Sequence, residues 1–193
     1  TLGSSYVNAS YVNANNHIKN KKGHNMTTLT KAQHLENINK VIDSVKYAMM
    51  TTITSDEKHL HACPMTTNKN DLENGKIWFI GDKKSETVQD LAKNPQVNLS
   101  YTSADQKDFV SINGVAELVD DKTKLDELWS PIYNAFYEKG KEDPNVQVIG
   151  VTCNGAQYWL SGNSVVNMFK LVSAAMQEGK TADNMGENHA VTF

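Results

Sequence analysis

The residue pattern that most suggests binding chemistry is a pair of lysines, Lys83 and Lys84, placed directly before Ser85. A predicted strand that closes on Trp78-Phe79-Ile80-Gly81 leads into this pair, and Ser85 has the hydroxyl that often begins a helix. Backbone N–H groups at a helix N-terminus carry partial positive charge, and the two ammonium groups add to it. The pattern therefore predicts a site for an anion such as a phosphate, with a phosphorylated cofactor as the first hypothesis.

Other reactive residue types have ordinary structural explanations. His59 and His61 alternate on a predicted strand like a metal pair, but no third ligand is nearby, which favours solvated histidines. Cys63 could be a redox thiol, although a small inward-facing apolar residue fits its position better. Asp120-Asp121 and Asp126-Glu127 suit a solvated helix start, where acids complement the helix dipole. The sequence therefore predicts no catalytic residue and no metal site.

Composition describes a globular protein without a basic surface. The 193 residues include 39% hydrophobic residues and carry a formal net charge of -3, which argues against nucleic acid or anionic membrane as a partner. All 19 basic residues are lysine, so ammonium groups, hydroxyls or amides must hold any phosphate. Two cysteines form neither a disulfide framework nor a zinc set, and no segment has the pattern of a signal peptide or membrane span. We expect a cytoplasmic protein.

The chain length suits one domain, which we place at residues 26–193. Residues 1–25 contain Tyr-Val-Asn-Ala twice and show neither helix nor strand periodicity. They are predicted to be a disordered segment or an added leader.

Apolar spacing predicts few helices and many strands. A helix should begin at Thr30, and a second, capped by Ser85, should end at Asn94-Pro95. A third helix is expected over 121–138, with Leu125, Leu128, Trp129, Ile132 and Phe136 on one apolar stripe and Pro131 as a kink or break. Strands are expected at 48–54, 59–67, 76–81, 96–102 and 109–119, with a bulge or bend at Gly114, and a last hairpin at 146–153 and 157–160 about Asn154-Gly155. A helix over 164–177 and a polar tail follow. This order indicates a mainly β (α+β) fold with a small closed or split barrel.

Several phrases of the sequence, in their order, resemble a known family. They are Pro64-Met65-Thr66-Thr67, Ile77-Trp78-Phe79, Asn94 to Tyr101, Ser111 to Leu118, Leu128-Trp129-Ser130-Pro131, Tyr158-Trp159 and the tail Gly179-Lys180 through Gly186-Glu187-Asn188-His189. The chain is similar to the general-stress-protein branch of the pyridoxamine 5'-phosphate oxidase-like, FMN-binding split-barrel family from Thr30 to Phe193. The resemblance implies a six-stranded antiparallel split β-barrel with flanking helices. It also implies a homodimer that holds FMN, occasionally FAD, in two equivalent clefts between subunits.

The resemblance also implies which residues contact the flavin ring. Met65, Thr66 and Thr67 would offer backbone and hydroxyl contacts along the ring, and Trp159 would border it from the neighbouring subunit. An ordinary barrel strand explains the first three residues as well, and a core position explains the tryptophan.

The remaining implied contacts lie toward the phosphate. Phe79, Ile80 and Gly81 would border the ribityl chain, while Lys84 and Ser85 would face the phosphate at the helix N-terminus. A plain helix cap explains Ser85 equally well.

Two departures from the family pattern remove positive charge from this anion site. Cys63 stands where relatives often have a basic residue, and Ser85-Glu86-Thr87 stands where they often have Ser-Pro-Lys. A unit charge pair about 4 Å apart is worth roughly 4 kcal/mol at an effective dielectric near 20, so flavin affinity should fall unless Lys83 or Lys84 compensates.

The resemblance implies a flavoprotein oxidoreductase in which the flavin carries the hydride and a nicotinamide nucleotide is the candidate electron donor. Since no acid–base residues were found, the alternative is a non-catalytic dimer that stores or shields a flavin or another small ligand. A third reading is a structural dimer that has lost its cofactor. Pyridoxamine phosphate is a poor candidate substrate, because the chain has no arginine to bind a second phosphorylated ligand.

Overall fold

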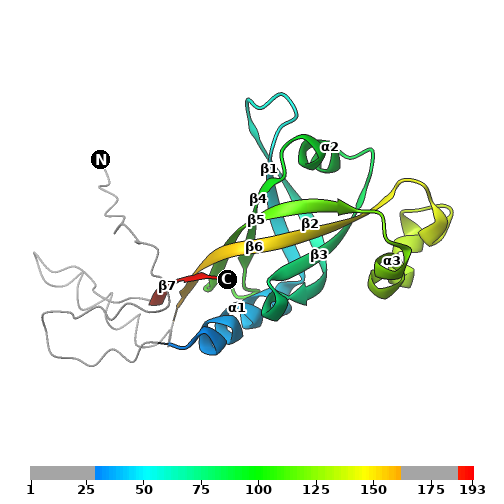
Figure 1. Cartoon of the computed structure of the whole chain (residues 1–193). Coiled ribbons are helices and arrows are strands. Elements are labelled where there is room, and N and C mark those ends of the chain that lie inside the picture. The colour runs from blue at the N-terminus through cyan, green and yellow to red at the C-terminus, as the bar shows by residue number, and fades with distance from the viewer. Residues whose placement is uncertain (1–28, 162–186) are drawn as a thin grey trace, which may run out of the picture.

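The computed structural model describes residues 29–161 and 187–193, and this part of the chain folds into one antiparallel sheet with helices around it (Figure 1). The strands are β1 (Tyr47–Ile53), β2 (Leu60–Asp71), β3 (Lys76–Asp82), β4 (Gln96–Thr102), β5 (Phe109–Val119), β6 (Val146–Leu160) and β7 (Glu187–Thr192). The α-helices are α1 (Lys31–Val45), α2 (Glu86–Lys93) and α3 (Lys122–Leu128), and the 3-10 helices are η1 (Leu72–Asn74), η2 (Pro131–Ala135) and η3 (Gly140–Glu142). The predictions for residues 1–25 and for a helix over 164–177 lie outside the described residues.

The sheet closes on itself to form a barrel. Its strand order is β3-β2-β1-β4-β5-β6-β7, and β3 also pairs with β6 from Lys76↔Thr152 to Asp82↔Val146. Within the described residues, six strands thus form a closed ring, and β7 extends the outer end of β6 (Figure 1). The predicted six-stranded antiparallel split barrel with flanking helices is confirmed.

The barrel core is built from alternate residues of the strands. Met50, Phe79, Leu99 and Ile149 are fully buried inside it, and Ile38 on α1 packs against the same cluster. Helix α1 begins at the predicted cap: Thr30 accepts a hydrogen bond from the Gln33 N–H, and Gln33 accepts one from the Thr30 N–H.

A second apolar cluster lies on the outer side of β3 and β6, beneath α3 and η2. Its buried members are Trp78, Ile80, Leu128, Tyr137, Val146 and Val148. Strand β3 is therefore buried on both faces, which explains why Ile77-Trp78-Phe79-Ile80 is a continuous apolar run rather than an alternating one.

The predicted hairpin about Asn154-Gly155 is wrong. Strand β6 continues unbroken from Val146 to Leu160, and the register passes from Gly114↔Cys153 to Asn113↔Gly155, which leaves Asn154 as a bulge. Pairing with β3, β5 and β7 outweighs the local turn preference of Asn-Gly. This register shift confirms the irregularity expected at Gly114. Glycine is required there, since a Cβ would lie 2.5 Å from the Thr152 carbonyl oxygen.

The third predicted helix is shorter than expected. Helix α3 ends at Leu128, and Pro131 begins η2, so the proline breaks the helix rather than kinking it. The predicted apolar stripe is buried at Leu128 but not past this break, where Ile132 is 68% exposed and Phe136 is 75% exposed. No described helix is long and apolar enough to cross a lipid bilayer.

Candidate functional site

The pleat of β2 sends the predicted ring-contact residues to opposite sides. Met65 and Thr67 face inward and are half-buried, and the Thr67 hydroxyl lies 3.0 Å from the hydroxyl of the buried Tyr101. Thr66 faces outward, is exposed, and pairs with Tyr47 on β1. A ligand along the outside of this strand could therefore reach the Thr66 hydroxyl but not that of Thr67.

The predicted ribityl contacts on β3 are buried. Phe79 is fully inside the barrel, while Ile80 lies in the cluster beneath α3, so both side chains are occupied by packing. Gly81 lies at a tight corner, where an added Cβ would come 3.2 Å from Val88 Cγ2 and 3.5 Å from Met65 Cε. The structure thus brings Met65, Gly81 and the start of α2 together, as the resemblance implies.

Ser85 is the N-cap of α2. Its hydroxyl donates to the Asp82 carbonyl oxygen at 2.7 Å and accepts from the Val88 N–H at 3.3 Å. The Lys84 N–H donates to Asp82 Oδ1 at 2.7 Å, while the Lys84 side chain is exposed. Lys83 pairs with Asp120 at 3.3 Å. Both hydrogen-bonding roles of the serine hydroxyl are used in shaping this terminus, so its contact with a phosphate stays a prediction.

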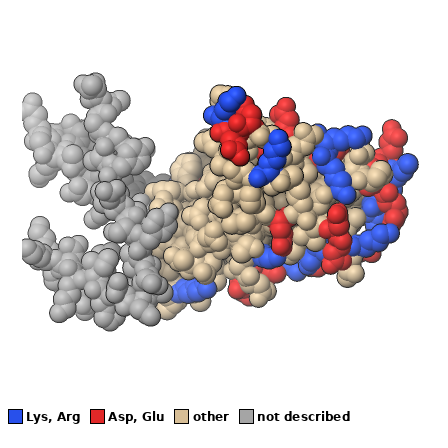
Figure 2. Space-filling view, turned by 45° about the horizontal axis from the view of Figure 1, so that its top comes forward, with Lys and Arg blue, Asp and Glu red and all other residues tan. Residues whose placement is uncertain are grey.

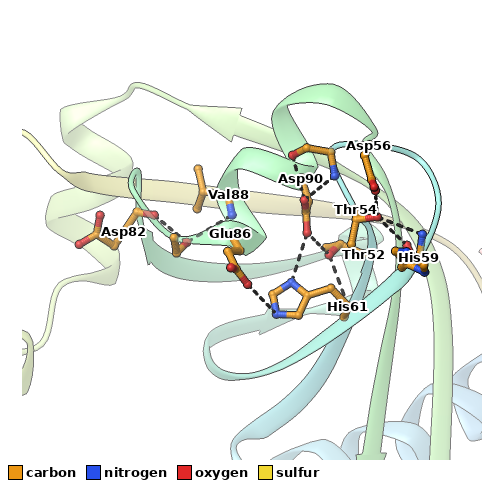
Figure 3. Close-up of polar contacts among 11 residues, drawn as sticks. Thr52, Thr54, Asp56, His59, His61, Asp82, Glu86, Val88 and Asp90 are labelled. Carbon is orange, nitrogen blue, oxygen red and sulfur yellow. Dashed lines mark hydrogen bonds and ion pairs between the residues drawn. The ribbon is translucent and has the colours of Figure 1, made fainter.

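A buried carboxylate beside this terminus escaped the sequence analysis. Asp90 on α2 accepts hydrogen bonds from the Thr52 hydroxyl at 3.0 Å and from the Ser55 N–H and hydroxyl at 2.8 and 3.0 Å (Figure 3). His61 Nδ1 lies 3.2 Å from the same carboxylate. Burial alone would raise the pKa of Asp90, but the hydrogen bonds from Ser55, His61 and Thr52 outweigh it and hold that pKa below its ordinary value. The carboxylate is ionised at neutral pH, so His61 Nδ1 carries the donated proton.

This contact corrects the view of His61 as a solvated histidine. Its other ring nitrogen, Nε2, lies 3.8 Å from the exposed Glu86 carboxylate, so the ring lies between two acids (Figure 3). His59 is exposed in the turn before β2 and does not join this cluster. Among residues 29–161 and 187–193, no group of three or more His, Cys, Asp or Glu side chains is arranged to hold a metal ion.

Trp159 is half-buried near the end of β6, paired with Phe109. In the closed ring only β3 lies between β6 and β2, but the β3–β6 pairing ends at Thr152, seven residues before Trp159, so strand pairing does not place Trp159 beside β2. This placement is compatible with the implied contact from a neighbouring subunit, which stays a prediction.

One part of the outward face of β1, β2, β4 and β5, away from Lys69 and Glu117, has no charged side chain. Large apolar residues are exposed on it: Leu60 by 75%, Tyr47 by 62%, Met49 by 44% and Phe109 by 43%. The face consists of Tyr47, Met49, Thr51 and Ile53 of β1; Leu60, Ala62, Pro64 and Thr66 of β2; Asn98, Ser100 and Thr102 of β4; and Phe109, Ser111 and Asn113 of β5. In the view of Figure 2, charged side chains gather over the α3 end and at the β1–β2 turn.

Comparison with known proteins identifies the family. A family model described as "Pyridoxamine 5'-phosphate oxidase like" matches residues 33–183. The chain belongs to this family. The general stress FMN/FAD binding protein of Xanthomonas citri is 30% identical, with a TM-score of 0.58 over 66% of this chain and 89% of that one. A Clostridium acetobutylicum protein related to general stress protein 26 shares the fold, with 21% identity and a TM-score of 0.59 over 67% of this chain and 89% of that one.

A Neurospora crassa protein also has a similar sequence. Protein bli-3 of Neurospora crassa is 25% identical over 158 residues, which are 78% of this chain and 76% of that protein. The general-stress-protein branch predicted from the sequence phrases is confirmed by the family model and the solved structures.

Proposed function

We propose that this protein is a flavin-binding general stress protein that takes FMN, with FAD as the alternative, along β2. Membership of the pyridoxamine 5'-phosphate oxidase-like family carries the proposal, together with the 30% identical Xanthomonas citri protein described as binding FMN or FAD. The cytoplasm remains the proposed compartment, on the cysteine content alone.

The residues around β2 fit an elongated ligand of this kind. The exposed Thr66 hydroxyl suits the ring end, and His61, five residues earlier, lies beside Glu86 in the first turn of α2. Gly81 lies between Met65 and Val88, which places the start of α2 near the neighbour of Thr66 and within reach of a ligand whose ring lies at Thr66. At that terminus the Lys84 ammonium group and the first-turn N–H groups would meet the phosphate. Ser85 would then contribute by shaping the terminus.

On the β3 side, backbone groups rather than side chains would border the ribityl chain. Phe79 and Ile80 are committed to the two apolar clusters, and Gly81 has no side chain. Met65, Thr66 and Thr67 would support the ring, and Trp159 of a second copy would cover it.

We include a homodimer in the proposal because of the uncharged part of the outward face, which is formed by residues 47–53 of β1, 60–66 of β2, 98–102 of β4 and 109–113 of β5. An exposed apolar sheet face of this kind is typical of a surface that pairs with another copy. Size-exclusion chromatography with light scattering should give twice the chain mass, whereas a stable monomer at micromolar concentration would contradict this part of the proposal.

The proposed activity is an oxidoreductase reaction with a nicotinamide nucleotide as donor. A bound flavin would supply the hydride chemistry, and the chain would bind it, orient it and exclude water. The alternative of a protein that stores or shields its ligand is favoured by one observation: the ionisable side chains beside Thr66 are the phenols of Tyr47 and Tyr133 rather than a carboxylate or an imidazole, and burial raises the pKa of Tyr133.

Two measurements test the proposal in turn. Titration of the purified protein with FMN should quench flavin fluorescence, and no binding at tens of micromolar would refute flavin binding. Anaerobic mixing of the loaded protein with NADPH should bleach the flavin and turn over repeatedly on reoxidation. A tightly bound flavin that NADPH leaves oxidised would support the storage alternative instead.

A further inference from the structure

A bulge in β2 fixes the orientation of one amide side chain. The register with β3 shifts between Thr67 and Lys69, and Asn68 lies at this irregularity. Its Oδ1 accepts from the Ile80 N–H at 3.0 Å, and its Nδ2 donates to the Leu128 carbonyl oxygen at 3.3 Å. A backbone N–H can only donate and a carbonyl oxygen can only accept, so these two contacts decide which side of the amide is oxygen and which is nitrogen.

The same amide determines the direction of the Tyr133 hydroxyl. Asn68 Nδ2 also lies 2.8 Å from the Tyr133 oxygen and must donate to it. The tyrosine oxygen is therefore the acceptor in this bond, and its own proton remains available to a different partner. The Thr66 side chain lies beside that hydroxyl, and Tyr47 is close by. An amide anchored at two backbone points thus presents a phenolic donor to the outward face of β2.

Packing holds the tyrosine in this place. Its ring lies 5.4 Å from the Trp129 ring, centroid to centroid, at the edge of the cluster beneath α3. Burial is the largest influence on the hydroxyl and raises its pKa, while hydrogen bonds from Asn68 and Thr66 oppose that effect. The group is thus a protonated donor at neutral pH. Packing fixes its ring, while its O–H bond can still rotate toward a ligand.

We infer that Tyr133 binds the cofactor, donating a hydrogen bond from its hydroxyl to an acceptor atom of the flavin ring on the outward face of β2 at Thr66. This inference rests on the proposed function and adds a ring contact that the family resemblance did not indicate. A carbonyl oxygen or unprotonated ring nitrogen suits this donor, whereas the proposed phosphate contacts are Lys84 and the start of α2.

The test compares Tyr133→Phe with Tyr137→Phe, using FMN and riboflavin as ligands. Tyr137 belongs to the same lobe, which we define as α3, η2 and the apolar cluster beneath them. It is buried among Trp78 and Ile80, so its variant removes a phenolic oxygen that lies away from β2. Tyr133→Phe should weaken both ligands by the same factor, roughly three- to tenfold, because the lost hydrogen bond is to the ring. It should also shift the visible absorption of the bound flavin, and Tyr137→Phe should do neither.

Each other outcome has a definite meaning. Unchanged binding in Tyr133→Phe, or a loss confined to FMN, would overturn the inference while leaving flavin binding intact. Absence of binding in the unmodified protein would instead refute the proposed function. If Tyr133→Phe does not fold, Asn68→Asp gives the answer: a carboxylate would still accept from Ile80 but would capture the tyrosine proton, so flavin affinity should fall with Tyr133 still present. Full affinity in Asn68→Asp would then overturn the inference.

Discussion

The corner formed by Asp90, Thr52, Ser55 and His61 and the lobe that contains Tyr133 both place polar side chains against β2. They differ in whether their hydrogen-bond donors are already paired within the protein. At the corner, the Asp90 carboxylate accepts from Thr52, from two groups of Ser55 and from His61, within a buried environment. At the lobe, both sides of the Asn68 amide are used, whereas the Tyr133 hydroxyl accepts from Asn68 and Thr66 and retains its own proton.

The comparison separates polar groups that hold the barrel together from groups that can meet a ligand. A buried polar group that is fully satisfied contributes to stability and is costly to disturb. A half-buried hydroxyl whose proton is not donated within the protein contributes less to stability, and it can donate that proton in a hydrogen bond to a ligand. The two regions should therefore respond oppositely when stability and binding are both measured.

The largest expected effect is on stability, at Asp90. Replacing it with Ala leaves the Thr52 hydroxyl, the Ser55 N–H and His61 without their buried acceptor, which should lower the free energy of unfolding by about 3 kcal/mol. Urea denaturation measures this change. Asp126→Ala is the control, because that carboxylate is exposed and pairs with Lys141, so it should cost under about 1 kcal/mol. Equal losses of unfolding free energy at the two positions would mean that the Asp90 contacts do not stabilise the fold more than an exposed ion pair does.

Acid should reduce the contribution of Asp90. Its folded-state pKa is depressed, so the stability it supplies is present above its unfolded-state pKa of about 4 and is lost as the pH falls through the lower folded-state pKa. The difference in urea midpoint between the unmodified protein and Asp90→Asn should therefore shrink between pH 6 and pH 3, values chosen to bracket that range. A gap that stays constant or widens on acidification would show that the carboxylate is not ionised by these contacts.

Sequence patterns predicted much of the fold because those features are local. The Thr30 and Ser85 caps and the break at Pro131 each depend on a few adjacent residues. Asn154-Gly155 misled the prediction because its turn preference is also local, whereas the pairing that overrides it comes from three strands distant in the chain.

The candidate site was harder to predict because its contacts join distant positions. Asp90 contacts Thr52 and His61, which are 38 and 29 residues away in the sequence, and Asn68 contacts Tyr133, which is 65 residues away. Only the folded chain brings these positions together. An aspartate in an amphipathic helix pattern gives no signal of burial. Tyr133 gives no sequence signal because it is not part of the apolar stripe predicted over 121–138, which includes the exposed Phe136.

An intermediate effect on binding is expected from Glu86, the exposed acid at the corner. Glu86→Gln removes a negative charge from the first turn of α2 and should tighten FMN about three- to fivefold at low salt, since an exposed charge about 4 Å from a phosphate costs roughly 1 kcal/mol. Riboflavin, which has no phosphate, should be unaffected, and the gain should shrink in high salt. Glu142→Gln is the control, because Glu142 is also exposed but pairs with Lys122 rather than with His61. A similar gain for riboflavin would place the phosphate away from α2.

The smallest expected effect is the stability cost of Tyr133→Phe. It decides whether the Tyr133 hydroxyl is available to a ligand or is needed to hold the fold together. Asn68→Ala should lower the free energy of unfolding by about 2 kcal/mol, because it leaves the buried Ile80 N–H without an acceptor. Tyr133→Phe removes one half-buried acceptor that water can replace, so it should cost under about 1 kcal/mol. Urea denaturation of the two variants without ligand gives the comparison. If the tyrosine variant proves as unstable as the asparagine variant, the hydroxyl is a structural group like Asp90 and the contrast between the two regions fails.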